Sequence, residues 1–185
     1  MDIFIPIRTL NDELITLVPL FPSDFESLYL AASDPLIWEQ HPNKDRYQRN
    51  VFKNYFDEAV NNKMAFKILD NNSGNIIGSS RFYEYNPELG SIAIGYTFLT
   101  RQYWGGKYNF ALKNLMLQYA FNIVDRVIFH VGILNRRSQK AMEKIGAQLI
   151  TEPQEYSRFD ESKNVLFCIT KTQWDDFLNR HNNRV

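Results

Sequence analysis

The sequence predicts an α/β (α+β) fold in which helices flank a mixed, mostly antiparallel sheet of about six to seven strands. Three observations predict it: two helical segments follow the first strand, three strands with short turns fill the middle, and a strand–helix–strand unit comes next. The 185 residues fit one domain, 1–185. Of these residues 44% are hydrophobic and 15% aromatic, so the chain has large side chains available for a core or a pocket.

The first third of the chain predicts one strand and two helices. LITLVPL, residues 14–20, reads as a strand, and residues 23–33 read as a helix capped by Ser23 with Glu26 completing a capping box. Residues 46–63 predict a second helix because apolar side chains recur there at helical spacing. Its apolar side is formed by Val51, Phe52, Tyr55, Phe56 and Ala59.

The middle of the chain predicts an antiparallel meander. Three segments with strand-like periodicity, 64–70, 76–85 and 91–99, are separated by the turn sequences NNSGN and NPELG. A glycine-containing loop follows, and then a predicted helix with apolar residues along one face, before the apolar segment 126–134. Segments 91–99 and 126–134 are therefore expected to be parallel neighbours, since such crossovers are right-handed and return to the same sheet.

The last third predicts two helices and two strands. The helix over 135–146 begins at Asn135 as N-cap and stops at Gly146, where a left-handed conformation is expected. Segments 147–152 and 164–172 read as antiparallel strands, and a final helix follows.

The loop RQYWGGKYNFALK, residues 101–113, is the first candidate for chemistry. It presents the backbone N–H groups of Trp104 through Asn109 at the opening of a helix, where the first donors have no partner within the helix. These donors and the helix dipole favour an anion, glycine lets a phosphate approach the backbone, and Arg101 and Lys107 add positive charge. The alternative is a plain glycine turn with solvated basic residues.

Several classes of site are absent from the sequence. It contains no P-loop, no dinucleotide-binding glycine motif, no G-x-S-x-G and no H-E-x-x-H. A single cysteine, Cys168, excludes an internal disulfide and a cysteine zinc cage. His41, His130 and His181 are too scattered to predict a metal site, and His130 is interpreted as a packed or hydrogen-bonded core residue.

Charge and hydropathy limit the partners. Lys and Arg total 21 and Asp and Glu total 21, so no net field favours nucleic acid or an anionic membrane. A nucleic-acid-binding domain stays open only because residues 101–144 hold eight basic residues against Asp125 and Glu143. No signal peptide or membrane span is indicated, so a cytoplasmic location is expected.

The order of elements and two motifs carry a resemblance. QYWGGK, residues 102–107, is similar to the pattern [Q/R]-x-x-G-x-[G/A], and NRRSQKAMEKIG follows one strand later. Together they resemble the GCN5-related N-acetyltransferase (GNAT) family, in its branch like the ribosomal-protein N-terminal acetyltransferases RimJ and RimL, from about residue 14 to 171. The resemblance implies the GNAT fold and acetyl-CoA as acetyl donor, with no metal.

The resemblance also implies positions for the donor. The N–H groups of Trp104 to Tyr108 wrap the pyrophosphate, the pantetheine lies along 96–99 where the parallel strands splay, and Asn135 contacts the pantetheine. The implied cofactor-binding residues are Tyr96, Thr97, Phe98, Leu99, Gln102, Trp104, Gly105, Gly106, Lys107, Tyr108, Asn109, Asn135 and Ser138.

The chain departs from the family pattern at three places. Met142 stands where many members have the tyrosine that protonates the leaving thiolate, Ala93 where this branch often has an acidic residue, and Lys107 where the pattern has a small residue. Ser138 is the candidate for the acid or sulfur-contacting role.

Two carboxylates are candidates for the base. Glu84 is the first, because it lies on the strand beside the proposed donor edge, and Glu152 is the second; solvated strand-end carboxylates are the alternative.

The sequence thus predicts an acetyl-CoA-dependent N-acetyltransferase that acts on a primary amine, either a protein N-terminus or a small molecule, by direct attack in a ternary complex. The alternative, suggested by the three departures, is a catalytically weak CoA-binding module of the same fold. A monomer or a homodimer is expected, with no nucleic acid and no membrane partner. Trp38 and Trp174 are interpreted as exposed aromatics of an interface or an acceptor groove.

Overall fold

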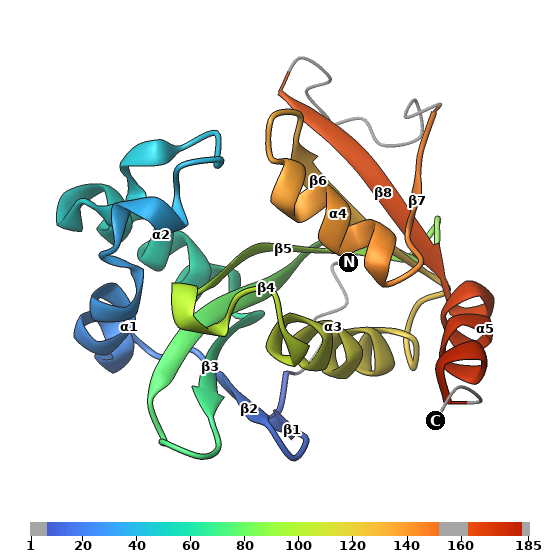
Figure 1. Cartoon of the computed structure of the whole chain (residues 1–185), viewed down its shortest axis with the longest axis horizontal. Coiled ribbons are helices and arrows are strands. Elements are labelled where there is room, and N and C mark those ends of the chain that lie inside the picture. The colour runs from blue at the N-terminus through green and yellow to red at the C-terminus, as the bar shows by residue number, and fades with distance from the viewer. Residues whose placement is uncertain (1–6, 152–162, 183–185) are drawn as a thin grey trace.

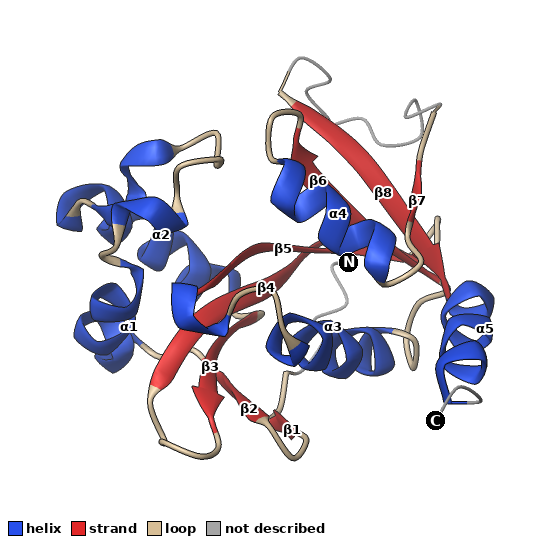
Figure 2. Ribbon diagram, in the orientation of Figure 1, coloured by secondary structure: helices blue, strands red, loops and turns tan. Residues whose placement is uncertain are grey.

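A computed structural model describes residues 7–151 and 163–182, which form an eight-stranded mixed sheet flanked by helices (Figures 1 and 2). The strand order is β1-β2-β3-β4-β5-β6-β8-β7. The strands are β1 Leu10–Asn11, β2 Ile15–Pro19, β3 Ala65–Asp70, β4 Ile76–Asn86, β5 Ser91–Leu99, β6 Arg126–Gly132, β7 Gln148–Leu149 and β8 Asn164–Thr170. The predicted fold class is confirmed; the two-residue β1 was not predicted.

Within the described residues, five α-helices pack on this sheet. They are α1 Phe25–Ala32, α2 Arg49–Asn62, α3 Lys107–Ala120, α4 Arg136–Lys144 and α5 Lys171–Asn182. Helices α1 and α2 share one apolar cluster, to which the sheet contributes Ala65 and Phe98. Helices α3, α4 and α5 share a second cluster, to which the sheet contributes residues such as Phe66 and Ile68. Neighbouring residues of β3 therefore enter different clusters, as the alternation of side chains along a strand requires.

The meander and the strand–helix–strand unit are confirmed. Strands β3, β4 and β5 pair antiparallel, whereas β5 and β6 pair parallel. The parallel register covers three pairs and ends at Ala93 with Ile128, although both strands continue beyond this point. The two strands therefore diverge, and Tyr96 lies on the free part of β5 with a positive φ of 52°.

Helix α4 begins and ends as the sequence predicts. The Asn135 side chain accepts a hydrogen bond of 3.1 Å from the Ser138 N–H, and Gly146 adopts a φ of 83°.

The predicted capping box of the first helix is wrong. Pro22 starts a 3-10 turn, η1 Pro22–Asp24, so α1 begins only at Phe25 and Ser23 lies inside the turn. The Asp24 carboxylate instead accepts the Phe21 N–H at 2.9 Å and pairs with Lys67 at 2.6 Å. Glu26 pairs with Arg49 on α2.

The prediction that Trp38 and Trp174 are exposed is also wrong. Their exposed fractions are 2% and 1%. Trp38 donates its indole N–H to the Ala32 carbonyl at 2.8 Å, and the Trp174 ring stacks on Phe177. Both rings are buried because apolar helices pack around them, which the local sequence does not reveal. None of the described helices has the length and apolar character needed to cross a membrane.

Candidate active site

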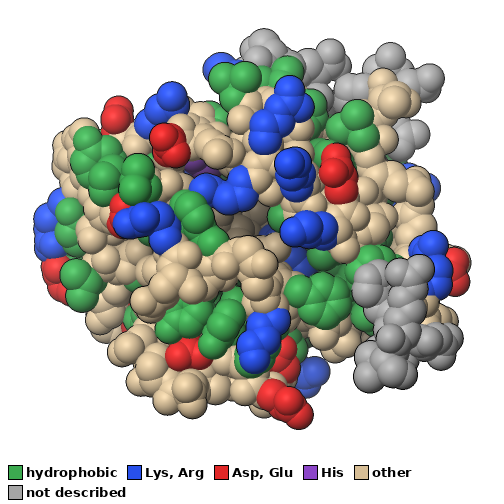
Figure 3. Space-filling model, in the orientation of Figure 1, with side chains coloured by type: hydrophobic (Ala, Val, Ile, Leu, Met, Phe, Trp, Pro, Cys, Tyr) green, Lys and Arg blue, Asp and Glu red, His purple; other side chains and the backbone are tan. Residues whose placement is uncertain are grey.

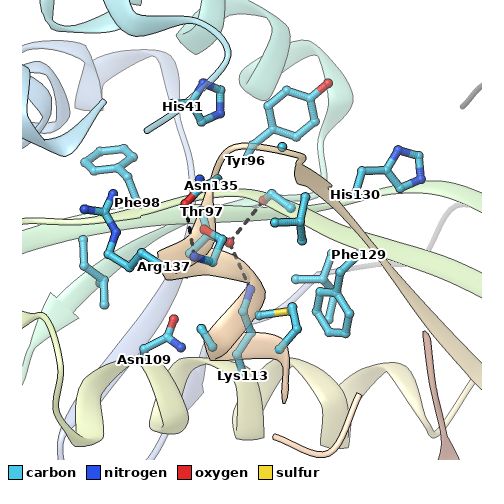
Figure 4. A pocket seen from close by; sticks show the side chains of 18 of the residues that line it. His41, Tyr96, Thr97, Phe98, Asn109, Lys113, Phe129, His130, Asn135 and Arg137 are labelled. Atoms are coloured by element: carbon cyan, nitrogen blue, oxygen red, sulfur yellow. Dashed lines mark hydrogen bonds between the residues drawn. The ribbon is translucent and has the colours of Figure 1, made fainter. Parts of the chain in front are cut away.

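A cavity of about 610 Å³ opens where β5 and β6 diverge. Its walls come from the start of α3, from α4 and from the short turns after α1 (Figure 4). In the close view, Asn109 and Lys113 lie at one end, on α3, whereas His41, Tyr96 and His130 lie at the other. The cavity is therefore an elongated site with two chemically different ends.

The α3 end of the cavity is open to an anion. The N-cap of α3 is Gly106, and no side chain caps the first N–H donors of the helix. Gly105 has a φ of 71°, and a Cβ added there would meet no atom within 4 Å. The Trp104 indole N–H holds the loop by donating to the Leu99 carbonyl at 2.7 Å. The Trp104 N–H, expected to be a free donor, instead donates to the Arg101 carbonyl at 3.0 Å. The backbone donors after Trp104 lie beside open space, which suits a phosphate group.

Positive charge dominates the walls. Among the described lining residues, one carboxylate, Glu84, stands against five Lys and Arg side chains. These are Arg46, Lys113, Arg137, Lys140 and Lys144. Figure 3 shows Lys and Arg side chains gathered around the central hollow. The arrangement suits a ligand that carries several phosphate charges at one end.

Arg137 contacts both the loop before α3 and the turn after α1. Its guanidinium lies 3.8 Å from the centre of the Trp104 ring and donates to the Ile37 carbonyl at 3.1 Å. Burial lowers the pKa of this guanidinium, but the charge is kept.

Lys113 forms part of the cavity wall and was not predicted from the sequence. Its exposed fraction is 3%, and its Nζ donates to the Thr97 Oγ1 at 3.1 Å. Thr97 is in turn 2.8 Å from the Ser80 hydroxyl. In the described part of the chain no carboxylate pairs with Lys113, and burial lowers its pKa to about 7. This lysine can therefore exchange a proton near neutral pH.

Glu84 and His130 face each other at the far end. The Glu84 Oε2 is 3.4 Å from the His130 Nε2, and Glu84 has a φ of 50°. Burial lowers the pKa of His130, and the Glu84 charge partly opposes this shift. A neutral imidazole beside a carboxylate is a suitable proton acceptor. His130 is thus largely buried, as predicted, but it also faces the cavity.

Asn135, the N-cap of α4, and Ser138, in the first turn of that helix, line the cavity. Asn135 is 7% exposed, and its Oδ1 is used in capping the helix. Met142 also lines the cavity with 5% exposure, so an apolar thioether that has no proton to donate forms part of this wall.

The cavity collects most of the residues that the sequence singled out. It is lined by Glu84, Tyr96, Thr97, Phe98, Leu99, Trp104, Gly105, Gly106, Asn109, Asn135 and Ser138. Gln102, Lys107 and Tyr108 do not line it. The Tyr108 hydroxyl instead donates to Asp70 at 3.0 Å, and Arg101, expected to add charge, is paired with Asp34. Glu152 lies outside the described residues.

No metal chemistry is indicated in the described ranges. Within 7–151 and 163–182, no group of three or more His, Cys, Asp or Glu side chains is placed to hold a metal ion.

Burial raises the pKa of the Cys168 thiol, which favours its protonated and less reactive form.

The family follows from comparison with known proteins. The sequence model of the acetyltransferase (GNAT) domain matches residues 15–148. The chain belongs to the GNAT family. Its members transfer acetyl groups, so the chain is an acyltransferase, and the GNAT fold binds acetyl-CoA. A search of curated proteins gives no match.

Solved GNAT structures share the fold at low identity. A GCN5-related N-acetyltransferase from Brucella melitensis is 17% identical with a TM-score of 0.77, over 92% of this chain and 81% of that one. An acetyltransferase from Agrobacterium tumefaciens is 19% identical with a TM-score of 0.71, over 92% and 99%. Mycobacterium smegmatis RimJ, in complex with CoA-disulfide, is 16% identical with a TM-score of 0.64, over 89% and 87%.

Proposed function

We propose that this GNAT protein is an acetyl-CoA-dependent N-acetyltransferase that acetylates a primary amine by direct attack in a ternary complex. The observation that carries the proposal is the cavity itself. At one end it has the uncapped start of α3 among basic side chains, and at the other the pair Glu84 and His130. One end suits the phosphates of the donor, and the other suits the amine.

The donor is proposed to lie along β5. Its pyrophosphate accepts hydrogen bonds from the backbone N–H groups of Gly105 and Gly106 at the start of α3, with Arg137 and Lys140 nearby as cations. The pantetheine follows residues 96–99 in the gap between β5 and β6, with Asn135 and Ser138 across from it on α4. This path would bring the thioester towards Tyr96, next to the far end.

The proposed reaction moves one acetyl group from sulfur to nitrogen and removes two protons from the acceptor ammonium, one before the attack and one after it. Glu84 and His130 accept a proton from the acceptor ammonium, directly or through a water, which leaves a neutral amine. The amine nitrogen attacks the thioester carbonyl, the new C–N bond forms and the C–S bond breaks, and the nitrogen releases its second proton to the solvent or to the departing thiolate. The products are the N-acetyl amine and, once the thiolate gains a proton, the CoA thiol.

Lys113 and Ser138 are the proposed proton donors to the thiolate. Met142 has no proton to give, whereas Lys113 lies in the same cavity with a pKa of about 7. A protonated Lys113 would also stabilise the negative sulfur by charge.

Thermal unfolding with candidate ligands tests the donor. Acetyl-CoA at 100 times its dissociation constant is expected to stabilise the fold by ~2.7 kcal/mol, because it binds the folded state only. ATP and NAD serve as controls that carry phosphates without pantetheine. If neither acetyl-CoA nor CoA raises the unfolding temperature, the proposal is wrong.

A CoA-binding module that does not turn over is the second candidate, favoured by Met142 in the cavity. Binding of acetyl-CoA without amine-dependent release of thiol would select it. A cytoplasmic location, the oligomeric state and the extent of the domain over 1–185 remain predictions from the sequence.

A further inference from the structure

Arg46 is a buried cation in the cavity wall that the acetyl transfer described above does not use. It lies in the 3-10 turn η3 Lys44–Tyr47, and its exposed fraction is 7%. Its guanidinium carbon lies 5.6, 4.8 and 5.7 Å from the ring centres of Trp38, Tyr55 and Tyr96. Three aromatic rings therefore hold the guanidinium in place.

Arg46 has no anionic partner of its own. Across the described residues, no carboxylate lies within ion-pair distance of its guanidinium. Burial lowers the pKa of Arg46, and the charge of Glu58 opposes this only weakly. Glu58 does not line the cavity and pairs with Arg81 at 3.5 Å. A buried guanidinium without a carboxylate is costly, so an anion that enters the cavity is favoured there.

The side-chain contact between Arg46 and His41 does not satisfy every hydrogen-bond donor around the His41 ring. The Arg46 Nη1 lies 3.1 Å from the His41 Nε2, while the His41 Nδ1 lies 3.0 Å from the Asn43 N–H. Burial and the Arg46 charge lower the pKa of His41 to about 3, so its ring is neutral. A neutral imidazole has one acceptor nitrogen, and arginine and a backbone N–H can only donate. One of the two donors therefore lacks an acceptor.

The position of this pair relative to the proposed base is informative. Figure 4 places His41 and His130 on either side of Tyr96. The Tyr96 ring contacts Tyr83 at 5.1 Å between centres, and Tyr83 contacts His130 at 5.6 Å. The end of the cavity assigned to the amine thus has an acid–base pair on one side of Tyr96 and a cationic, donor-rich pair on the other.

We propose that the acceptor is an amine that also carries a carboxylate, with the carboxylate bound by Arg46 and His41 and the amino group directed at Glu84 and His130. This inference rests on the proposed acetyl transfer and names its substrate class. The carboxylate oxygens accept hydrogen bonds from the Arg46 guanidinium and from the His41 N–H when Nε2 carries the proton. Free amino acids and peptides that begin with an acidic residue share this chemistry.

Matched acceptors test the proposal without altering the protein. Rates of thiol release are measured with glycine against glycinamide, and with a peptide that begins with Asp against the same peptide beginning with Asn. We expect kcat/KM to be about 10- to 100-fold higher for the acid in at least one pair, mainly through KM. The pair that shows the preference tells a free amino acid from a peptide N-terminus. Equal rates within both pairs overturn the proposal.

Variants locate the preference. Arg46→Met is expected to lower kcat/KM for the preferred acid far more than kcat/KM for its neutral partner, so that the ratio of the two approaches one, while Arg46→Lys restores part of the preference. Arg49→Met is the matched control, since Arg49 lies three residues away, is exposed and pairs with Glu26 outside the cavity. A preference for the acid that survives in Arg46→Met overturns the assignment to Arg46.

The outcome is separable from that of the proposed function. Acetyl-CoA binding is measured on the same samples by thermal unfolding. Transfer to amines of every kind with no preference for the acid removes this inference alone, whereas binding without transfer to any acceptor removes the proposed enzyme activity.

Discussion

At the scale of single residues, Lys113 links the site to stability. Its pKa is about 7 in the folded chain, against ~10.4 for an unperturbed lysine. Between these pH values the unfolded chain holds a proton that the folded chain has lost, so stability rises with pH across the window. Below pH 7 the folded state bears the full penalty of a buried charge, which is at most ~5 kcal/mol.

Lys113→Met is therefore expected to be more stable than the parent protein at pH 6, with a difference that shrinks as the pH rises to 10. Urea unfolding at pH 6, 7, 8 and 9 measures this difference. Lys107→Met, at the exposed start of the same helix, is the control and should leave the pH dependence of the parent in place. Parallel curves for Lys113→Met and the parent would contradict a buried, uncompensated lysine.

Some of the residues that form the cavity could be predicted from the sequence and others could not. Glu84, Asn135 and the glycine pair could be proposed because each sits at a recognisable place in a strand, a helix cap or a loop. Lys113 could not, since a lysine next to the apolar stripe of a helix is ordinarily solvated. Arg46 could not be predicted for a similar reason. It is buried because three aromatic rings from different elements pack around its guanidinium.

At the scale of elements, the loop before α3 contains Gly105, where the effect of backbone strain on stability can be measured separately from the effect on ligand binding. Gly105 and Gly74 have φ values of 71° and 72°, and in both cases an added Cβ meets nothing within 4 Å. Gly74 lies in the turn between β3 and β4 and does not line the cavity. Alanine at either position is strained by the left-handed backbone alone, at about 1–2 kcal/mol.

Gly105→Ala and Gly74→Ala are expected to lose similar stability in urea unfolding, but only Gly105→Ala should weaken acetyl-CoA binding, by about tenfold, because its methyl group would lie at the proposed phosphate site. Isothermal titration with acetyl-CoA measures the affinity. The same affinity in both variants would move the phosphate site away from this loop.

Most elements could be predicted because their signals are local. The meander follows from alternation and turn residues, and α4 follows from Asn135 and Gly146 at its two ends. The start of α1 could not be predicted correctly, because Pro22 and the Asp24 contacts with Phe21 and Lys67 decide it. The contact with Lys67 spans 43 residues of sequence and has no local signature.

At the scale of the whole molecule, the site depends on the divergence of β5 and β6. The parallel crossover predicts that the two strands are neighbours, but the end of their pairing at Ala93 and Ile128 is set by how the sheet twists and by what packs between them. The divergence makes one cavity from segments that lie far apart in the sequence, such as those of Ile37 and Arg137, which are 100 residues apart and share a hydrogen bond. A composition with no net charge conceals the positive cavity that results.

The central claim is that this cavity transfers an acetyl group from acetyl-CoA to an amine. The most direct measurement follows the release of CoA thiol from acetyl-CoA, with and without an amine panel of amino acids, their amides and N-terminal peptides, together with the mass of the acceptor. The account predicts amine-dependent thiol release and an acceptor heavier by one acetyl group. Tight binding of acetyl-CoA with no amine-dependent thiol release from any acceptor would contradict it.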